Sequence, residues 1–119
     1  MNRSISILRT GSFLLASLQE DLSDAEILDI QEQILTNVLK WNAKGVILDV
    51  SSVDVMDSFS TRTLADIAAA VELRGAKMAI TGIQPEVALS MVLLGLKLPK
   101  TIKALDLDRA MEMLTKELA

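Results

Sequence analysis

The chain has 119 residues, half of them apolar and 3% aromatic, with a formal net charge of -4. This length suits one domain with an aliphatic core, and an acidic chain with few aromatic side chains is a poor partner for nucleic acid. The absence of histidine and cysteine from the sequence excludes Ser-His and Cys-His catalysis, ordinary zinc sites and disulfides. The apolar stretches are too interrupted for a signal peptide or a spanning helix, so we expect a cytoplasmic protein that binds no membrane.

The first third of the chain predicts a hairpin followed by a helix. Two short strands, over residues 5–8 and 13–18, flank a turn at residues 9–12. Ser23-Asp-Ala-Glu26 has the capping-box pattern, in which a serine and a glutamate three residues later satisfy each other's backbone amides, so a helix should begin there. Gly45 should terminate this helix after about Ala43. Residues at helical spacing predict its buried face: Ile27, Ile30, Gln31, Ile34, Leu35, Val38 and Trp41.

The rest of the chain alternates strands with helices. The apolar run 45–50 is typical of a strand buried on both faces of a parallel sheet. A helix over 58–74, a strand over 77–81, a helix from Pro85 to Gly95, a short strand over 101–105 and a last helix capped by Asp106 complete the pattern. The two longer helices should turn these side chains inward: Leu64, Ile67, Ala68 and Val71 in one, and Leu107, Ala110, Met111, Leu114 and Leu118 in the other.

These elements predict a single α/β domain over residues 1–119. Its mixed sheet should begin with the N-terminal hairpin and continue with parallel strands that alternate with helices. Sites on such sheets lie in the loops after the carboxyl ends of the strands, which here are residues 51–58 and 81–85.

Three carboxylates lie in or beside the first of these loops. Asp49, Asp54 and Asp57 could hold a hard cation through oxygen ligands, but their spacing fits no calcium loop, and solvated charges or helix caps are the simpler interpretation. Asp49 at a strand end is also similar to the phospho-acceptor of a receiver domain. The strands before it lack the paired acidic residues that would bind the required magnesium, so that interpretation is rejected. We expect no metal and no cofactor.

Ser58, at the start of the predicted helix, is the main candidate. It could be a plain N-cap, worth about 1 kcal/mol. Alternatively, it is a phosphate acceptor: a phosphate there would meet free backbone amides and the positive end of the helix dipole, with Arg62 one turn away, while Asp54 and Asp57 would repel it. Phosphorylation would then disrupt a docked partner rather than create a fold.

Other hydroxyls near the same edge of the sheet are secondary candidates. Thr81 ends a buried strand directly before Gly82, where it could be modified or could simply bond the turn backbone. Ser60 and Thr61 lie in the first turn of the helix at 58–74, where we expect them to be exposed. Any mapping of phosphate must therefore separate these residues from Ser58.

Two segments carry a resemblance to a known family. Val55-Met-Asp-Ser-Phe59 after one apolar strand, and Ile80-Thr-Gly-Ile-Gln-Pro-Glu-Val-Ala88 after the next, resemble a STAS domain of the stressosome antagonist (RsbS) type. The similarity runs from about Ile5 to Leu118, without a sensory N-terminal module. It implies a non-enzymatic scaffold that co-assembles with RsbR-type sensor paralogues and sequesters an RsbT-type serine kinase.

The resemblance also implies a switch. The family's phosphorylated serine falls on Ser58, its modification would release the kinase, and an RsbX-type phosphatase would reset the complex. Thr81 matches the position of an additional phosphorylatable threonine in the sensor paralogues. The surface expected to dock the kinase surrounds Ser58 and comprises Met56, Asp57, Phe59 and Arg62.

Other functions remain open at this point. A stand-alone anti-sigma-factor antagonist that binds a switch-protein kinase is disfavoured by Phe59, because such antagonists tend to have Ser-Gly after the phosphorylated serine. An enzyme would need a Ser-Lys arrangement, since histidine is absent. A small-ligand module would lack both common glycine-rich phosphate loops, because the five glycines are scattered singly.

Overall fold

A mixed sheet lies at the centre of the part of the chain that the computed structural model describes, residues 5–19, 22–98 and 100–118. The elements, in chain order, are β1 (Ile5–Thr10), β2 (Phe13–Leu18), α1 (Asp24–Trp41), β3 (Gly45–Asp49), α2 (Ser58–Leu73), β4 (Lys77–Thr81), α3 (Pro85–Leu93), β5 (Ile102–Ala104) and α4 (Leu107–Glu117). The strands are arranged in the order β1-β2-β3-β4-β5. β1 pairs with β2 antiparallel, and all later pairs are parallel. The predicted α/β fold with its N-terminal hairpin is therefore confirmed.

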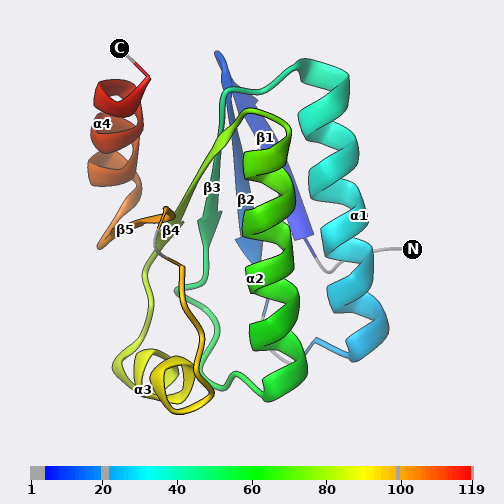
Figure 1. Cartoon of the computed structure of the whole chain (residues 1–119), viewed down its shortest axis with the longest axis vertical. Coiled ribbons are helices and arrows are strands. Elements are labelled where there is room, and N and C mark those ends of the chain that lie inside the picture. Colours follow the sequence, from blue (N-terminus) through cyan, green and yellow to red (C-terminus); the bar gives the residue numbers. More distant parts are fainter. Residues whose placement is uncertain (1–4, 20–21, 99, 119) are drawn as a thin grey trace.

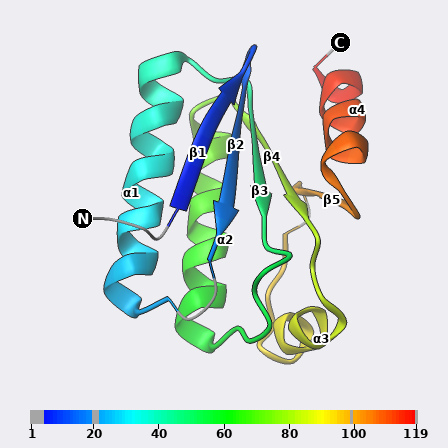
Figure 2. The ribbon, with the colours of Figure 1, turned by 180° about the vertical axis from the view of Figure 1, so that it is seen from behind.

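The helices form layers on the sheet (Figure 1). α1 and α2 pack side by side over one face, and α4 covers β3, β4 and β5 from the other. α3 lies beyond the carboxyl ends of the parallel strands, at the same end of the molecule as the start of α2, as the view from behind also shows (Figure 2). This end of the sheet is where both predicted loops meet.

Alternation along the strands divides the core into two clusters. In β2, Leu14 and Ala16 belong to the larger cluster under α1 and α2, whereas Phe13 belongs to the smaller cluster under α4. The central strand β3 contributes to both, because Val46 and Leu48 face one side and Ile47 the other. A strand buried on both faces is what the continuous apolar run 45–50 predicts, so this prediction is confirmed.

The helix ends follow local sequence signals in most places. The capping box of Ser23 and Glu26 is present, Pro85 starts α3, and the Asp106 side chain accepts a hydrogen bond from the Arg109 amide. Gly45 does not terminate α1, contrary to the prediction. The left-handed residue Asn42 (φ 50°) does so, and Gly45 is the first residue of β3.

The buried faces predicted for α1 and α4 include residues that are exposed in the structure. Trp41, at the end of α1, is 42% exposed, and the Arg9 guanidinium lies 4.4 Å from the centroid of its ring. In α4 only Ala110 and Leu114 are buried, because α4 lies on the face opposite α1 and α2 and contacts the strands along a narrow stripe. Leu107 and Leu118 are exposed. No helix in the described ranges is long and apolar enough to cross a membrane.

Candidate functional site

Ser58 is the first residue of α2, but it is not the cap. Asp57 has extended backbone geometry and is the N-cap, because its Oδ1 accepts a hydrogen bond of 2.8 Å from the Ser60 amide. The interpretation of Ser58 as the N-cap is therefore wrong. The Ser58 side chain is exposed, and its hydroxyl makes no hydrogen bond to any residue that the structure describes. It is free to meet an incoming group.

The carboxylate next to this hydroxyl is charged at neutral pH. The backbone hydrogen bond from Ser60 is the main cause that lowers the pKa of Asp57 below its ordinary value, and a side-chain hydrogen bond from Ser60 acts in the same direction. Both bonds stabilise the ionised form, and the opposing effect of burial is smaller. Any further negative charge placed on Ser58 would therefore stand beside an existing one.

Removing this cap should weaken the start of α2. We expect Asp57→Ala to lower the free energy of unfolding by about 1 kcal/mol at pH 7, and Asp57→Asn by less, because asparagine also caps helices. Since the pKa of Asp57 is lowered in the folded chain, the charge-dependent part is fully present above the unfolded pKa and is lost as the pH falls through the folded one. Urea unfolding at pH 7 and at about pH 2.5 checks this. If the difference in free energy of unfolding between the wild type and Asp57→Ala were the same at both pH values, a carboxylate cap would be contradicted.

The second predicted loop is joined to the first by a short network. The strand register sets Thr81 opposite Asp49, and the Thr81 hydroxyl donates to Asp49 Oδ1 at 2.8 Å. Asp49 Oδ2 accepts from the Ser51 hydroxyl at 2.6 Å, and the Gln84 amide donates to the Ser51 carbonyl at 2.7 Å. The loops after β3 and β4 are therefore held as one unit at the carboxyl edge of the sheet.

Thr81 is not a simple strand-end residue. It is 1% exposed, and its hydroxyl bonds the Asp49 carboxylate rather than the turn backbone, which corrects that interpretation. Modification of Thr81 would require this bond to open and the hydroxyl to leave the interior. Thr61 is 3% exposed and Ser60 is half-buried, so the expectation that both are exposed is wrong.

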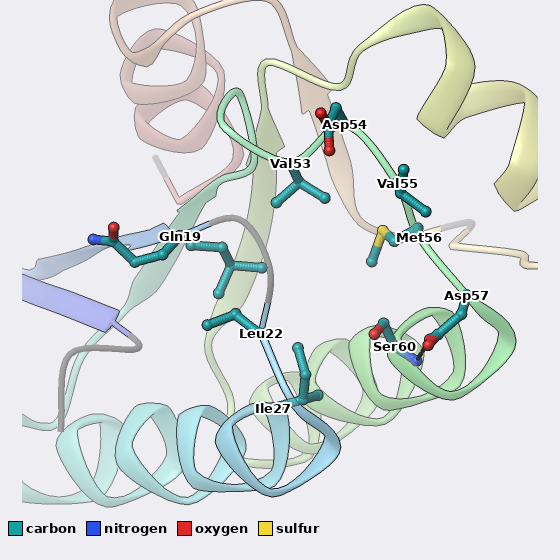
Figure 3. A pocket seen from close by; sticks show the side chains of 10 residues that line it. Gln19, Leu22, Ile27, Val53, Asp54, Val55, Met56, Asp57 and Ser60 are labelled. Carbon is teal, nitrogen blue, oxygen red and sulfur yellow. Dashed lines mark hydrogen bonds between the residues drawn. The ribbon is translucent and has the colours of Figure 1, made fainter.

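The loop before Ser58 presents a different apolar side chain from the one predicted. Met56 is 7% exposed and belongs to the core, so it supports the loop from beneath instead of offering its side chain to a partner. Val55 is 78% exposed. Figure 3 shows Met56 turned toward Leu22 and Ile27, across a cavity of about 190 Å³. Sequence patterns missed Val55 because an irregular loop has no periodicity from which burial can be read.

The other residues predicted around Ser58 lie in the first turns of α2. Phe59 is half-buried, and its carbonyl accepts a hydrogen bond from the Thr63 hydroxyl. Arg62 is exposed one turn after Ser58. The site thus combines a free hydroxyl, an adjacent carboxylate, an exposed valine and a cation.

This arrangement and fold agree with comparisons to known proteins. Residues 4–106 match the STAS domain, and the chain belongs to that family. RsbT co-antagonist protein RsbRA of Bacillus subtilis (strain 168) is 32% identical over 83 residues, which are 70% of this chain and 30% of that protein. The chain thus spans about a third of the length of this relative.

Solved structures give the same result over nearly the whole chain. RsbS S58E of Moorella thermoacetica is 30% identical with a TM-score of 0.86, and the match covers 96% of this chain and 97% of that one. A chain in a structure of the molecular architecture of the stressosome is 32% identical with a TM-score of 0.84, over 95% and 98%. The unphosphorylated anti-sigma factor antagonist SpoIIAA, 17% identical over 94% and 96% with a TM-score of 0.76, shares the fold. The predicted resemblance to the RsbS type is confirmed.

Proposed function

We propose that this chain is a non-catalytic, cytoplasmic scaffold of a stressosome-type complex. It co-assembles with RsbR-type STAS proteins and retains an RsbT-type serine kinase until Ser58 is phosphorylated, and an RsbX-type phosphatase restores the first state. The observation that carries the proposal is the exposed, unbonded Ser58 hydroxyl beside the ionised Asp57. Similarity to RsbS S58E of Moorella thermoacetica and to a chain of the stressosome structure supports the scaffold role. The name of the RsbRA relative, a co-antagonist of RsbT, supports that class of kinase as a partner.

The covalent step needs groups that the kinase must supply. Ser58 Oγ attacks the γ-phosphorus of ATP, the new O–P bond forms, and the bond from that phosphorus to the bridging oxygen of ADP breaks. ADP leaves with the electron pair, and the hydroxyl proton passes to a base of the kinase. Asp57 is a poor base for this proton, because its hydrogen bonds lower its pKa. The chain is therefore a substrate in this reaction and not its catalyst.

The product changes the surface that a partner meets. A phosphoryl group adds a charge of about -1.5 to -2 next to Asp57. The neighbouring surface includes the exposed Val55, the half-buried Phe59 and Arg62. A partner docked there would face both charge repulsion and the cost of removing water from the phosphate. Loss of the kinase follows without any need for the domain to unfold.

Charge-mimicking variants test this proposal. We expect Ser58→Asp to weaken retention of an RsbT-type kinase by the complex with an RsbR-type partner by about tenfold or more, roughly 1.4 kcal/mol, and Ser58→Ala to retain it. Ser52→Asp is a matched control, because Ser52 is exposed in the same loop and the substitution adds the same charge. Retention is measured by sedimentation of the assembled complex, with unfolding curves to show that all variants are folded. Equal retention by the two Ser58 variants would refute the switch.

Direct modification is the complementary measurement. The assembled complex is incubated with kinase and ATP, and peptide fragmentation assigns phosphate among Ser58, Ser60, Thr61 and Thr81. Phosphate on Ser58 together with release of the kinase supports the proposal. Release with phosphate only at another of these residues would move the switch away from Ser58.

A further inference from the structure

A groove lies directly beside Ser58. Its volume is about 380 Å³, and it separates the first turns of α2 from the chain that follows α3. Ser58, Thr61, Arg62 and Ala65 line one wall, and residues 94–97 line the other. Figures 1 and 2 show how the chain after α3 runs back past the start of α2. We call this space the α2 groove.

Two cations border the α2 groove without a counter-charge. Arg62 and Lys97 are both exposed, and neither makes an ion pair with any residue in the described ranges. Lys100, near Lys97 in sequence, does have a partner, because its Nζ lies 3.2 Å from Glu72 Oε1. The positive charge of the α2 groove is therefore available to an anion.

The α2 groove also contains an unused hydrogen-bond donor. Thr61 is 3% exposed, and its Oγ1 is buried without a hydrogen-bond partner among the described residues. A buried hydroxyl without a hydrogen-bond partner is destabilising. It can donate to an acceptor on a ligand without breaking an existing hydrogen bond. Ser58 adds the first backbone amide of α2, which has no acceptor within the helix. The Phe59 amide already acts on the Asp57 carboxylate. The Ser60 amide is already taken by Asp57.

These features match the chemistry of a phosphoryl group attached to Ser58. We propose that this group turns into the α2 groove and binds the side chains of Arg62 and Lys97, with the Thr61 hydroxyl as a further donor. This rests on the proposed function, since it requires Ser58 to be the modified residue. The phosphate has three acceptor oxygens and a charge of about -1.5 to -2, enough to use both cations. The phosphoryl group thus fills the groove and neutralises Arg62 and Lys97. A kinase that docks on these two side chains would lose its contacts with both.

A titration of the phosphate tests this without the kinase. Phosphoserine is placed at position 58 by genetic code expansion, and ³¹P NMR follows its second ionisation, whose ordinary pKa is about 6. Nearby cations stabilise the dianion, so we expect this pKa to be lower in the folded chain than in the urea-unfolded chain by about half a pH unit or more. Arg62→Gln and Lys97→Gln should each reverse part of the shift. Lys100→Gln is the matched control and should leave it unchanged, because Lys100 pairs with Glu72 and does not line the groove.

A second variant addresses the threonine. Thr61→Val keeps the shape of the side chain and removes the unpartnered hydroxyl, so the unmodified chain should fold with equal or higher Tm. We also expect phosphate binding in the groove to raise the Tm of the phosphoserine chain above that of the unmodified chain, and Thr61→Val should diminish this rise. A folded-state pKa equal to or above that of the unfolded chain would show that repulsion by Asp57 dominates, and would overturn the proposal. A lowered phosphate pKa that neither Arg62→Gln nor Lys97→Gln changes would also overturn the proposal.

These outcomes are separable from those of the proposed function. If a kinase fails to modify Ser58, the proposed switch fails, while the installed phosphoserine still reports whether the groove binds phosphate. If the titration shows no cation effect, the switch can still operate by repulsion, and only binding in the α2 groove is overturned.

Discussion

Gly82→Ala should destabilise the chain by about 3 kcal/mol or more, the largest effect we expect from any single added methyl group. Gly82 has a φ of +74°, a left-handed conformation that costs other residues about 1–2 kcal/mol. In addition, a Cβ at this position would lie 2.7 Å from Ser51 Cβ and 3.1 Å from Ser51 Cα. One of these atoms belongs to the backbone, so the loop after β3 would have to move away.

Gly11→Ala is the matched control. Gly11 is also left-handed, with a φ of +58°, but an added Cβ there would meet nothing within 4 Å. We therefore expect a loss of only about 1–2 kcal/mol, from conformation alone. Urea unfolding of both variants gives the two free energies, and amide chemical shifts of residues 50–57 should change in Gly82→Ala only. Equal losses in the two variants would mean that the contact with Ser51 is relieved without cost.

The close approach at Gly82 explains why the two loops act together. Alanine is unfavourable at position 82 because the chain after β4 passes close to Ser51. The Ser51 hydroxyl donates to Asp49, and the Ser51 carbonyl accepts from Gln84. Ser51 begins the segment that leads to Asp57 and Ser58. A shift of Ser51 caused by a side chain at position 82 would therefore act directly on the loop that precedes α2.

Local signals predicted the fold well. The capping box of Ser23 and Glu26, Pro85 at the start of α3 and the alternating strands each depend on residues close in sequence, so each could be recognised in the sequence. For the N-cap of α2 the sequence offered two candidates, Ser58 and the carboxylate of Asp57, and the structure selects Asp57. Asp57 and Ser58 are adjacent and equally suited to capping, so composition cannot choose between them, whereas the backbone geometry does.

The parts of the site that depend on distant residues were not predictable in this way. Thr81 and Asp49 are 32 residues apart, and only the strand register brings them together. Lys97 enters the α2 groove because the chain turns back after α3, and a lone lysine gives no sign of this in the sequence. Met56 and Val55 are adjacent in an irregular loop, where burial is decided by the path of the backbone.

Thr81→Val should lower the free energy of unfolding by about 2 kcal/mol, although it alters hardly any volume. The substitution removes the hydroxyl that donates to Asp49 Oδ1, and hydrogen bonds to charged groups contribute about 1.5–3 kcal/mol. The half-buried Asp49 carboxylate would keep its bond from the Ser51 hydroxyl, so the loss is partial. Urea unfolding at pH 7 measures the change.

Thr81→Ser separates the hydrogen bond from the packing. Serine keeps the donor and loses only the methyl group, so it should cost about 1 kcal/mol, less than valine does. If Thr81→Ser lost more stability than Thr81→Val, packing of the Thr81 methyl group would be the dominant contribution and the bond to Asp49 a minor one. The same pair bears on modification at this position. The Thr81 hydroxyl can be phosphorylated only after its hydrogen bond to Asp49 opens. The free energy of unfolding lost in Thr81→Val therefore measures part of the cost of exposing Thr81. Ser58 is already exposed.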